Sequence, residues 1–223
     1  MEKMVTSKQV YYNWIIDIMA FIISILFFII PYNSNQNIPI DELIMKADNY
    51  TSECKFKDAF KIYSKALVRE PNNSDILRKI GICFIGIEYF NKTCKNLFIY
   101  YPAWSIEEIK RIKPPIQMIN KNLRKAIFYC KRAVEEEKSD FDKVEGYLAL
   151  GLAYYCISDF EGAKTYFEKA TQLKVEVNRS DEAFIYSYLN GTSWMALGLI
   201  YEKLHYSKEL IEECKNNAKI NYK

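Results

Sequence analysis

One spacing of large and small side chains occurs four times in this 223-residue chain and restricts the folds open to it. Residues 194–201 read WMALGLIY and residues 147–154 read YLALGLAY, with glycine fifth and tyrosine eighth. Looser copies are LRKIGICF at 77–84 and LIMKADNY at 43–50. A fixed pattern that recurs along a chain is the signature of a repeat architecture.

A second pattern, alanine, aromatic and alanine spaced by four and three residues, follows each copy of the first. Its members are Ala59, Tyr63 and Ala66 (with Pro71 after them), then Ala126, Cys130 and Ala133, and then Ala163, Phe167 and Ala170. The last copy is poor, with Leu210, Cys214 and Asn217 at these positions. Only seven glycines and six prolines occur, too few for an all-β fold, which needs frequent turn signals.

Together these residues resemble the tetratricopeptide-repeat (TPR) family over residues 40–220. The resemblance implies an all-α fold, a right-handed solenoid of about four helical hairpins. It also implies that small residues such as Gly151 lie where the two helices of a hairpin approach closely. Aromatic residues such as Tyr154 and Phe167 are then expected to fill the space between one hairpin and the next.

The spacing of the repeats predicts where extra residues lie. Ala47 and Gly81 are 34 residues apart, but Gly81 and Gly151 are 70 apart, so the second hairpin contains an insertion at about 88–120. Within it we expect a short helix over 106–113, and candidate docking residues Tyr100, Tyr101, Trp104, Lys110, Arg111 and Lys113. Gly151 and Gly198 are 47 apart, which predicts a long loop at 174–182. Residues 207–219 are predicted to form a polar capping helix.

Residues 14–32, WIIDIMAFIISILFFIIPY, are predicted to form a transmembrane anchor. Nineteen residues with one charge, Asp17, are long enough to span a bilayer, and aromatic residues flank them. The alternative is a signal peptide, but no small-x-small cleavage site follows. Residues 1–13 are then a flank and 33–39 a linker. Lys3 and Lys8 predict a cytosolic N-terminus, with the repeat array on the opposite side of the membrane.

The charge distribution is uneven, although the formal net charge is only +3. Ten Lys or Arg and two Glu lie between Lys92 and Arg132, whereas six acidic residues and two lysines lie between Glu135 and Glu145. Solvated helix faces explain both stretches. The basic stretch also fits a patch near anionic lipid headgroups, where each cation is worth roughly 1 kcal/mol.

The resemblance implies a concave groove lined by the first helix of each hairpin. The lining residues expected from the matched positions are Ile82, Ile85, Leu148, Leu152, Tyr155, Met195 and Leu199. This apolar lining fits an amphipathic helix of a partner protein, unless the chain's own segments fill it. Positions that bind an acidic chaperone tail in some family members are Ile44, Asp48, Lys79, Glu145 and Ala149. Only Lys79 is basic among them, which argues against that role.

The sequence predicts no enzyme, cofactor or metal site. His205 is the only histidine, no nucleotide-binding or hydrolase motif occurs, and the six cysteines form no CxxC pair. Cys130, Cys156 and Cys214 are expected to be buried. The expected partners are proteins and the membrane, with no nucleic acid or small-molecule substrate. Three functions remain open: an adaptor, an accessory subunit of a membrane complex, and a membrane-tethered holdase.

Overall fold

The computed structural model describes residues 38–89, 121–176 and 179–221. In this described part all regular elements are α-helices: α2 (Ile40–Ser52), α3 (Phe56–Arg69), α4 (Ser74–Tyr89), α6 (Lys121–Glu136), α7 (Asp140–Cys156), α8 (Phe160–Gln172), α9 (Ser180–Lys203) and α10 (Lys208–Asn221). The predicted anchor at 14–32, the helix at 106–113 and the six docking residues of the insertion lie outside it. No helix of the described part is both long and apolar enough to cross a bilayer.

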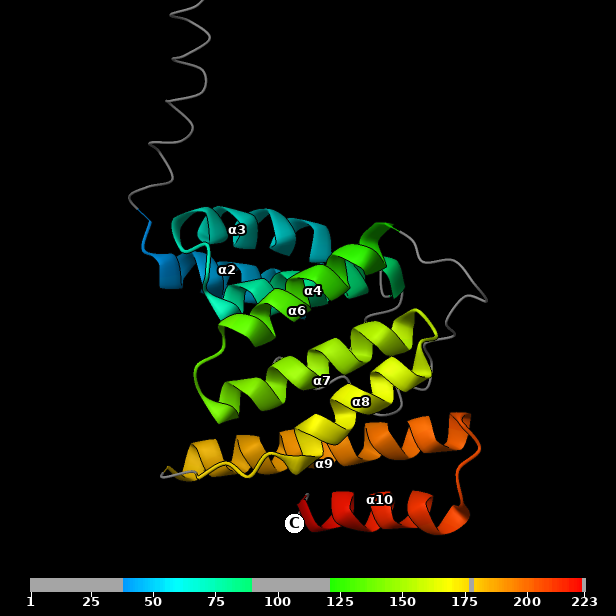
Figure 1. Ribbon diagram of the computed structural model, residues 1–223. Helices are drawn as coiled ribbons and strands as arrows, with labels where there is room; N and C mark the ends of the chain where they lie inside the picture. Colours follow the sequence, from blue (N-terminus) through cyan, green and yellow to red (C-terminus); the bar gives the residue numbers. More distant parts are fainter. Residues whose placement is uncertain (1–37, 90–120, 177–178, 222–223) are drawn as a thin grey trace, which may run out of the picture. The chain divides into compact units, whose positions relative to one another are not determined.

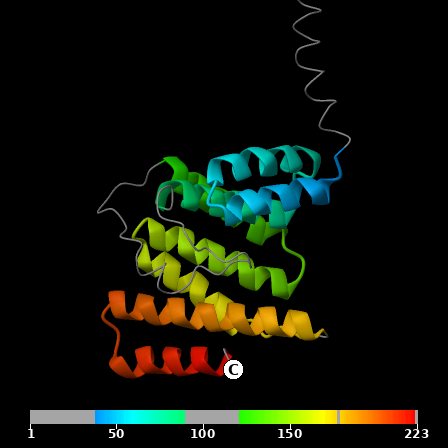
Figure 2. The same cartoon turned by 180° about the vertical axis from the view of Figure 1, so that it is seen from behind.

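The chain divides into a unit of residues 1–42 and a unit of residues 43–223, and the helices belong almost entirely to the second. Consecutive helices pack as hairpins: α4 with α6, α7 with α8, and α9 with α10. A hydrogen bond between Tyr63 and Asp48 joins α3 to α2 in the same way. Each hairpin packs on the next through α3–α4, α6–α7 and α8–α9 contacts. Figures 1 and 2 show this stacking in chain order, which confirms the predicted all-α hairpin architecture.

The turn inside the hairpin has the same backbone conformation in three hairpins. Cys54, Ser158 and His205 adopt the left-handed conformation, with φ of 58°, 63° and 58°. In each turn the next N–H donates to the carbonyl of the tyrosine that ends the first repeat pattern. These bonds run from Lys55, Asp159 and Tyr206 to Tyr50, Tyr154 and Tyr201, at 2.8, 3.1 and 2.9 Å. This is the Schellman arrangement that ends a helix, so the sequence repeat is also a backbone repeat.

Residues of the two sequence patterns contact each other inside the hairpins, and the same pattern positions are paired each time. A Cβ added at Gly151 would lie 2.6 Å from the ring of Phe167, closer than packed carbon atoms approach. Gly81 faces Cys130 in α6 and Gly198 faces Cys214 in α10 in the same way. The fifth position of the first pattern therefore lies against the central position of the second, as the small side chains predicted.

The aromatic residues divide between two kinds of contact. Phe167 packs inside its own hairpin, whereas Phe84 and Tyr201 reach the preceding one. Phe84 lies 4.9 Å from the ring of Phe60 in α3, between ring centroids, and the Tyr201 hydroxyl donates to Glu168 at 3.0 Å. The expectation that all of them lie between hairpins is therefore correct for some positions and wrong for Phe167.

Two helix boundaries differ from the sequence expectation. α9 begins at Ser180 and has 24 residues, so part of the extra length placed in a loop at 174–182 belongs to a longer first helix. α10 covers 208–221 rather than 207–219. The reason is that the signature marks positions near hairpin contacts and carries no information about how far a helix extends beyond them.

The first and second helices of the hairpins are buried to different extents. In α4 all eleven residues from Ile76 to Gly86 are buried, and the burial is also extensive in α7 from Val144 to Cys156 and in α9 from Leu189 to Ile200. The second helices bury one stripe each, such as Phe56, Ala59, Tyr63 and Ala66 in α3. A helix with one apolar stripe covers a core, whereas a helix apolar all round lies within one.

Candidate functional site

The residues predicted to line a groove lie on the first helices α4, α7 and α9, but they are not open to solvent. Six of the seven expose 8 % of their surface or less: Ile82, Ile85, Leu148, Leu152, Tyr155 and Leu199. Met195 is half-buried. In the described part of the chain this face is therefore an apolar layer with little accessible area.

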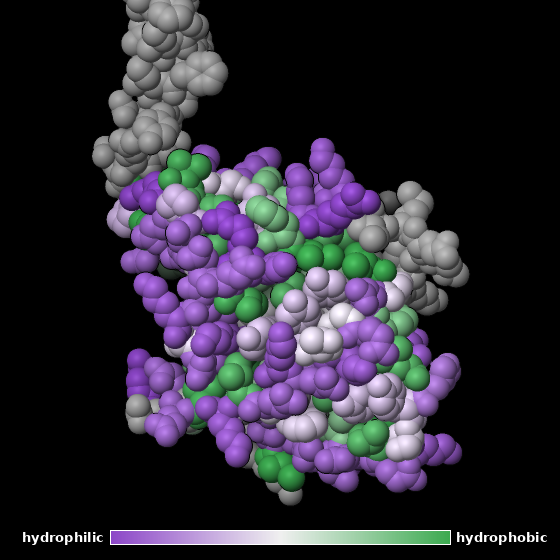
Figure 3. Space-filling model, in the orientation of Figure 1, coloured by the Kyte–Doolittle hydropathy of each residue, from purple (hydrophilic) through white to green (hydrophobic). Residues whose placement is uncertain are grey.

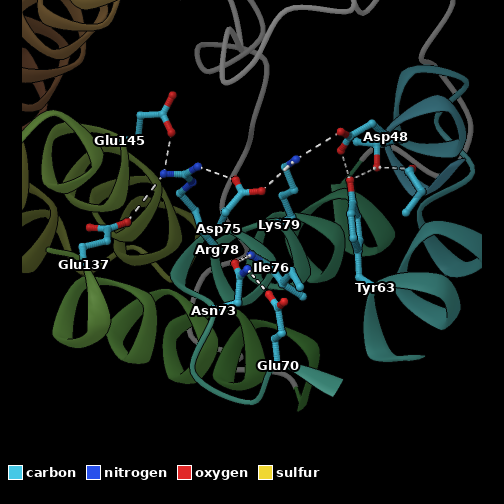
Figure 4. A network of polar contacts seen from close by, with 12 residues as sticks. Asp48, Tyr63, Glu70, Asn73, Asp75, Ile76, Arg78, Lys79, Glu137 and Glu145 are labelled. Atoms are coloured by element: carbon cyan, nitrogen blue, oxygen red, sulfur yellow. Dashed lines mark hydrogen bonds and ion pairs between the residues drawn. The ribbon is translucent and has the colours of Figure 1, made fainter. Parts of the chain in front are cut away.

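A buried ionic cluster lies beside this layer, where the first three hairpins meet (Figure 4). At its centre is Arg78 of α4, only 4 % exposed. Its guanidinium pairs with Asp75 one turn earlier at 2.6 Å and with Glu145 of α7. A third carboxylate, Glu137 after the end of α6, lies 3.5 Å away. One cation thus connects the second hairpin to the third.

Lys79, the neighbour of Arg78, extends the cluster to the first hairpin. Its ammonium group lies 3.0 Å from Asp75 and 3.1 Å from Asp48 of α2. Asp48 also accepts a hydrogen bond from the hydroxyl of Tyr63 in α3. Burial, and next this bond to Asp48, raises the pKa of Tyr63, so the phenol stays protonated and acts as a donor.

Glu137 is the least satisfied group of the cluster. Its side chain has no exposed surface, and neither carboxyl oxygen has a hydrogen-bond partner. Burial raises its pKa to about 8, although the charge of Arg78 opposes the shift. Burial also raises the pKa of Glu145. Gly146 provides the space, since any Cβ at that position would overlap the Glu137 carboxyl group.

The cluster has more carboxylates than cations. Four acidic residues, Asp48, Asp75, Glu137 and Glu145, surround Arg78 and Lys79. Protonation of Glu137 lowers this excess of negative charge. A buried acid with a raised pKa is a common feature of functional sites as well as of structural ion pairs. Here its neighbours are ion-paired groups that join helices, so the arrangement fits a structural role.

The sequence identified part of this cluster. Asp48, Lys79 and Glu145 stand at groove positions of the family that the sequence resembles, and the structure brings all three into one network. Arg78, Asp75 and Glu137 were missed. The adjacent Arg78 and Lys79 within the apolar run of α4 are the available signal, since a buried cation needs carboxylate partners.

The buried cysteines do not form a reactive site. Cys83, Cys130, Cys156 and Cys214 are buried, as expected for the last three. Burial raises the pKa of the Cys83 and Cys130 thiols to about 12, so both are protonated near neutral pH, and the thiolate is the nucleophilic form. Among the described residues no group of His, Cys, Asp or Glu is arranged to hold a metal ion.

Comparison with known proteins gives no assignment. No protein-family model matches the chain, and a search of curated proteins finds no significant match. The geometry of the hairpins is therefore the basis for any functional inference.

Proposed function

We propose that this chain is a membrane-anchored scaffold of the tetratricopeptide-repeat type, which binds a partner protein and transforms no substrate. The observation that carries the proposal is that a structural repeat coincides with the repeat in the sequence. The left-handed turn after Tyr50, Tyr154 and Tyr201 and the close approach at Gly81, Gly151 and Gly198 recur at matching positions. Stacked hairpins of this kind present extended binding surfaces. The anchor is the apolar segment 14–32.

The face of α4, α7 and α9 supports one binding mode, an amphipathic helix of the partner laid along the apolar layer. Leu148, Leu152 and Leu199 are buried in this structure. Binding in this mode therefore requires a rearrangement of the array that makes these three side chains accessible to the partner helix. Met195 is the one predicted lining residue that is already partly accessible.

Apolar residues outside this face favour a second candidate function, that of an accessory subunit of a membrane complex. Phe184 is 75 % exposed and Ile220 is 70 % exposed. Phe184 belongs to α9 and Ile220 to α10, and these two helices are joined near this point by a hydrogen bond from the Ser187 hydroxyl to the carbonyl of Asn221. The face drawn in Figure 3 is mostly hydrophilic, with separate apolar patches. A permanent partner subunit would bury such exposed side chains.

One experiment tests the proposal and separates the two candidates. The tagged full chain is extracted in mild detergent at native expression, and the mass and composition of its complexes are determined. Recovery in one complex of fixed stoichiometry, lost in Phe184→Ser/Ile220→Ser but kept in the control Val68→Ser, supports the accessory subunit. If the wild-type chain is recovered with partner proteins and the Met195→Glu variant is recovered without them, the result supports the adaptor. Recovery as a free monomer without any partner contradicts both.

A further inference from the structure

The outward face of α6 is strongly basic. It carries five cations within twelve residues, Lys121, Arg124, Lys125, Lys131 and Arg132, and no carboxylate before Glu135. Lys121, Arg124 and Lys131 are exposed. In the middle lies Phe128, with 56 % of its surface exposed. We call these six residues the α6 basic face.

The cations of the α6 basic face are not neutralised by the described part of the chain. No described carboxylate lies within ion-pair distance of Lys121, Arg124 or Lys131. Glu88 of the neighbouring helix α4 accepts a hydrogen bond from Asn122 at 3.4 Å and makes no ion pair with these three cations.

The other two cations hold the face in place. Lys125 lies 5.0 Å from the ring centroid of Phe84. Arg132 donates to the carbonyl of Pro71 at 3.1 Å and lies 6.0 Å from the ring centroid of Phe128. Buried Leu123, Ala126, Cys130 and Ala133 fix the opposite side of the helix in the hairpin. The basic face is therefore a preformed surface, directed away from the core.

A cluster of lysines and arginines is attracted to anionic lipid headgroups, and an exposed aromatic ring among them fits the interface between headgroups and hydrocarbon. The linker between the predicted anchor and α2 has seven residues, 33–39, and spans at most about 25 Å, so the proposed anchor would hold the array within that distance of a membrane surface. A tether of this length gives the headgroups a high effective concentration. Weak electrostatic attraction is then sufficient for contact.

We propose that the α6 basic face binds the anionic headgroups of the membrane that anchors the chain, with Phe128 inserted at the interface. This inference rests on the proposed anchor. It places the array on the side of the anionic leaflet, which in a cell is the cytoplasmic one. That is the side opposite to the one that Lys3 and Lys8 predict, so the two expectations can be told apart.

The test compares two kinds of vesicle that contain the full chain, one of phosphatidylcholine alone and one with about 30 mol% phosphatidylserine. A membrane-impermeant acylating reagent modifies the accessible lysines, and mass spectrometry gives the rate at each. We expect acylation of Lys121 and Lys131 to be about threefold slower or more with phosphatidylserine, and the protection to disappear at about 0.5 M salt. Lys203 and Lys219, exposed in the last hairpin, should react equally in both.

A matched pair of variants tests the surface itself. Arg124→Gln/Lys131→Gln should abolish the protection of Lys121, whereas Lys57→Gln/Lys65→Gln, on the exposed face of α3, should leave it unchanged. Equal acylation in the two vesicles would overturn the proposal. Protection in native membranes but not in phosphatidylserine vesicles would also overturn it, in favour of an acidic protein. Flotation with phosphatidylcholine vesicles tests the anchor separately.

Discussion

At the scale of single residues, Arg78 and Glu137 show how a helical array tolerates charge in its interior. Arg78 is paired closely with Asp75 and Glu145, whereas the Glu137 carboxyl group lies 3.5 Å from the Arg78 guanidinium and makes no hydrogen bond. A buried ion pair contributes little net stability, but removal of one partner leaves an uncompensated charge. We therefore expect substitution of Arg78 to destabilise the array and substitution of Glu137 to stabilise it.

We expect Arg78→Met to destabilise the array by about 3–5 kcal/mol, because it leaves the Glu145 carboxylate buried without its cation. Denaturant unfolding of the full chain in detergent measures the change. The double variant Arg78→Met/Glu145→Met should recover most of the loss, and Lys131→Met, at an exposed cation, should stay near the wild type. A loss in Arg78→Met that the second substitution leaves unchanged would show that packing, and not charge, is responsible.

Glu137→Gln should instead stabilise the array, and increasingly so as the pH rises. The pKa of Glu137 is about 8 in the folded chain and about 4.3 in an unfolded one. Between these values the folded state binds more protons, so the wild-type free energy of unfolding falls as the pH rises from about 5 to about 8. The Glu137→Gln variant has no carboxyl group at this position, so its free energy of unfolding lacks this pH-dependent loss.

The stabilisation by Glu137→Gln should reach the order of 1–3 kcal/mol at pH 8 and be small at pH 5. Unfolding curves of the full chain at several pH values measure it. The exposed neighbour Glu135 supplies the control, since Glu135→Gln should keep the wild-type dependence. A constant difference between wild type and Glu137→Gln at every pH would refute the assignment of a raised pKa to this carboxyl group.

At the scale of the helices, the left-handed residue in the hairpin turn is the repeated device that reverses the chain. Three non-glycine residues, Cys54, Ser158 and His205, occupy this position. The left-handed conformation is unfavourable for residues with a Cβ. Around Ser158, two backbone hydrogen bonds and the Asp159 cap of α8 enforce it.

Ser158→Gly should stabilise the α7–α8 hairpin by about 0.5–1 kcal/mol, because glycine adopts a positive φ without steric cost. The midpoint of thermal unfolding, followed by circular dichroism, should rise. Ser158→Ala keeps a Cβ at the same position and should give no gain. If both variants behave alike, loss of the serine side chain rather than backbone strain is the cause.

At the scale of the whole molecule, membrane attachment is the property on which the proposed function depends. Arginine near the middle of a spanning helix costs about 2.5–3.5 kcal/mol. Ile22→Arg/Leu26→Arg should therefore release the full chain from membranes on alkaline carbonate extraction, whereas the wild type stays in the pellet. Asn35→Arg, in the linker, is the control. Retention of the double variant would show that the array, or a partner, holds the chain at the membrane.

The sequence predicted the repeat, and with it most of the fold. The resemblance to the repeat signature predicts a close approach at Gly81, Gly151 and Gly198, because a hairpin repeat depends on local contacts that recur at fixed intervals. The length of α9 was not predictable in this way. The additional turns of that helix depend on neighbours that the signature does not encode.

Tertiary structure alone decided the environment of each site residue. From the sequence Ile82, Leu152 and Leu199 are groove-lining positions, and only their packed surroundings show that they are buried. The cluster of Arg78, Glu137 and Glu145 joins residues up to 67 positions apart. Their charges and desolvation depend on which helices meet in space. The repeat follows from short-range order along the chain, whereas burial and pairing follow from long-range contacts, which a single sequence specifies only through the folded state.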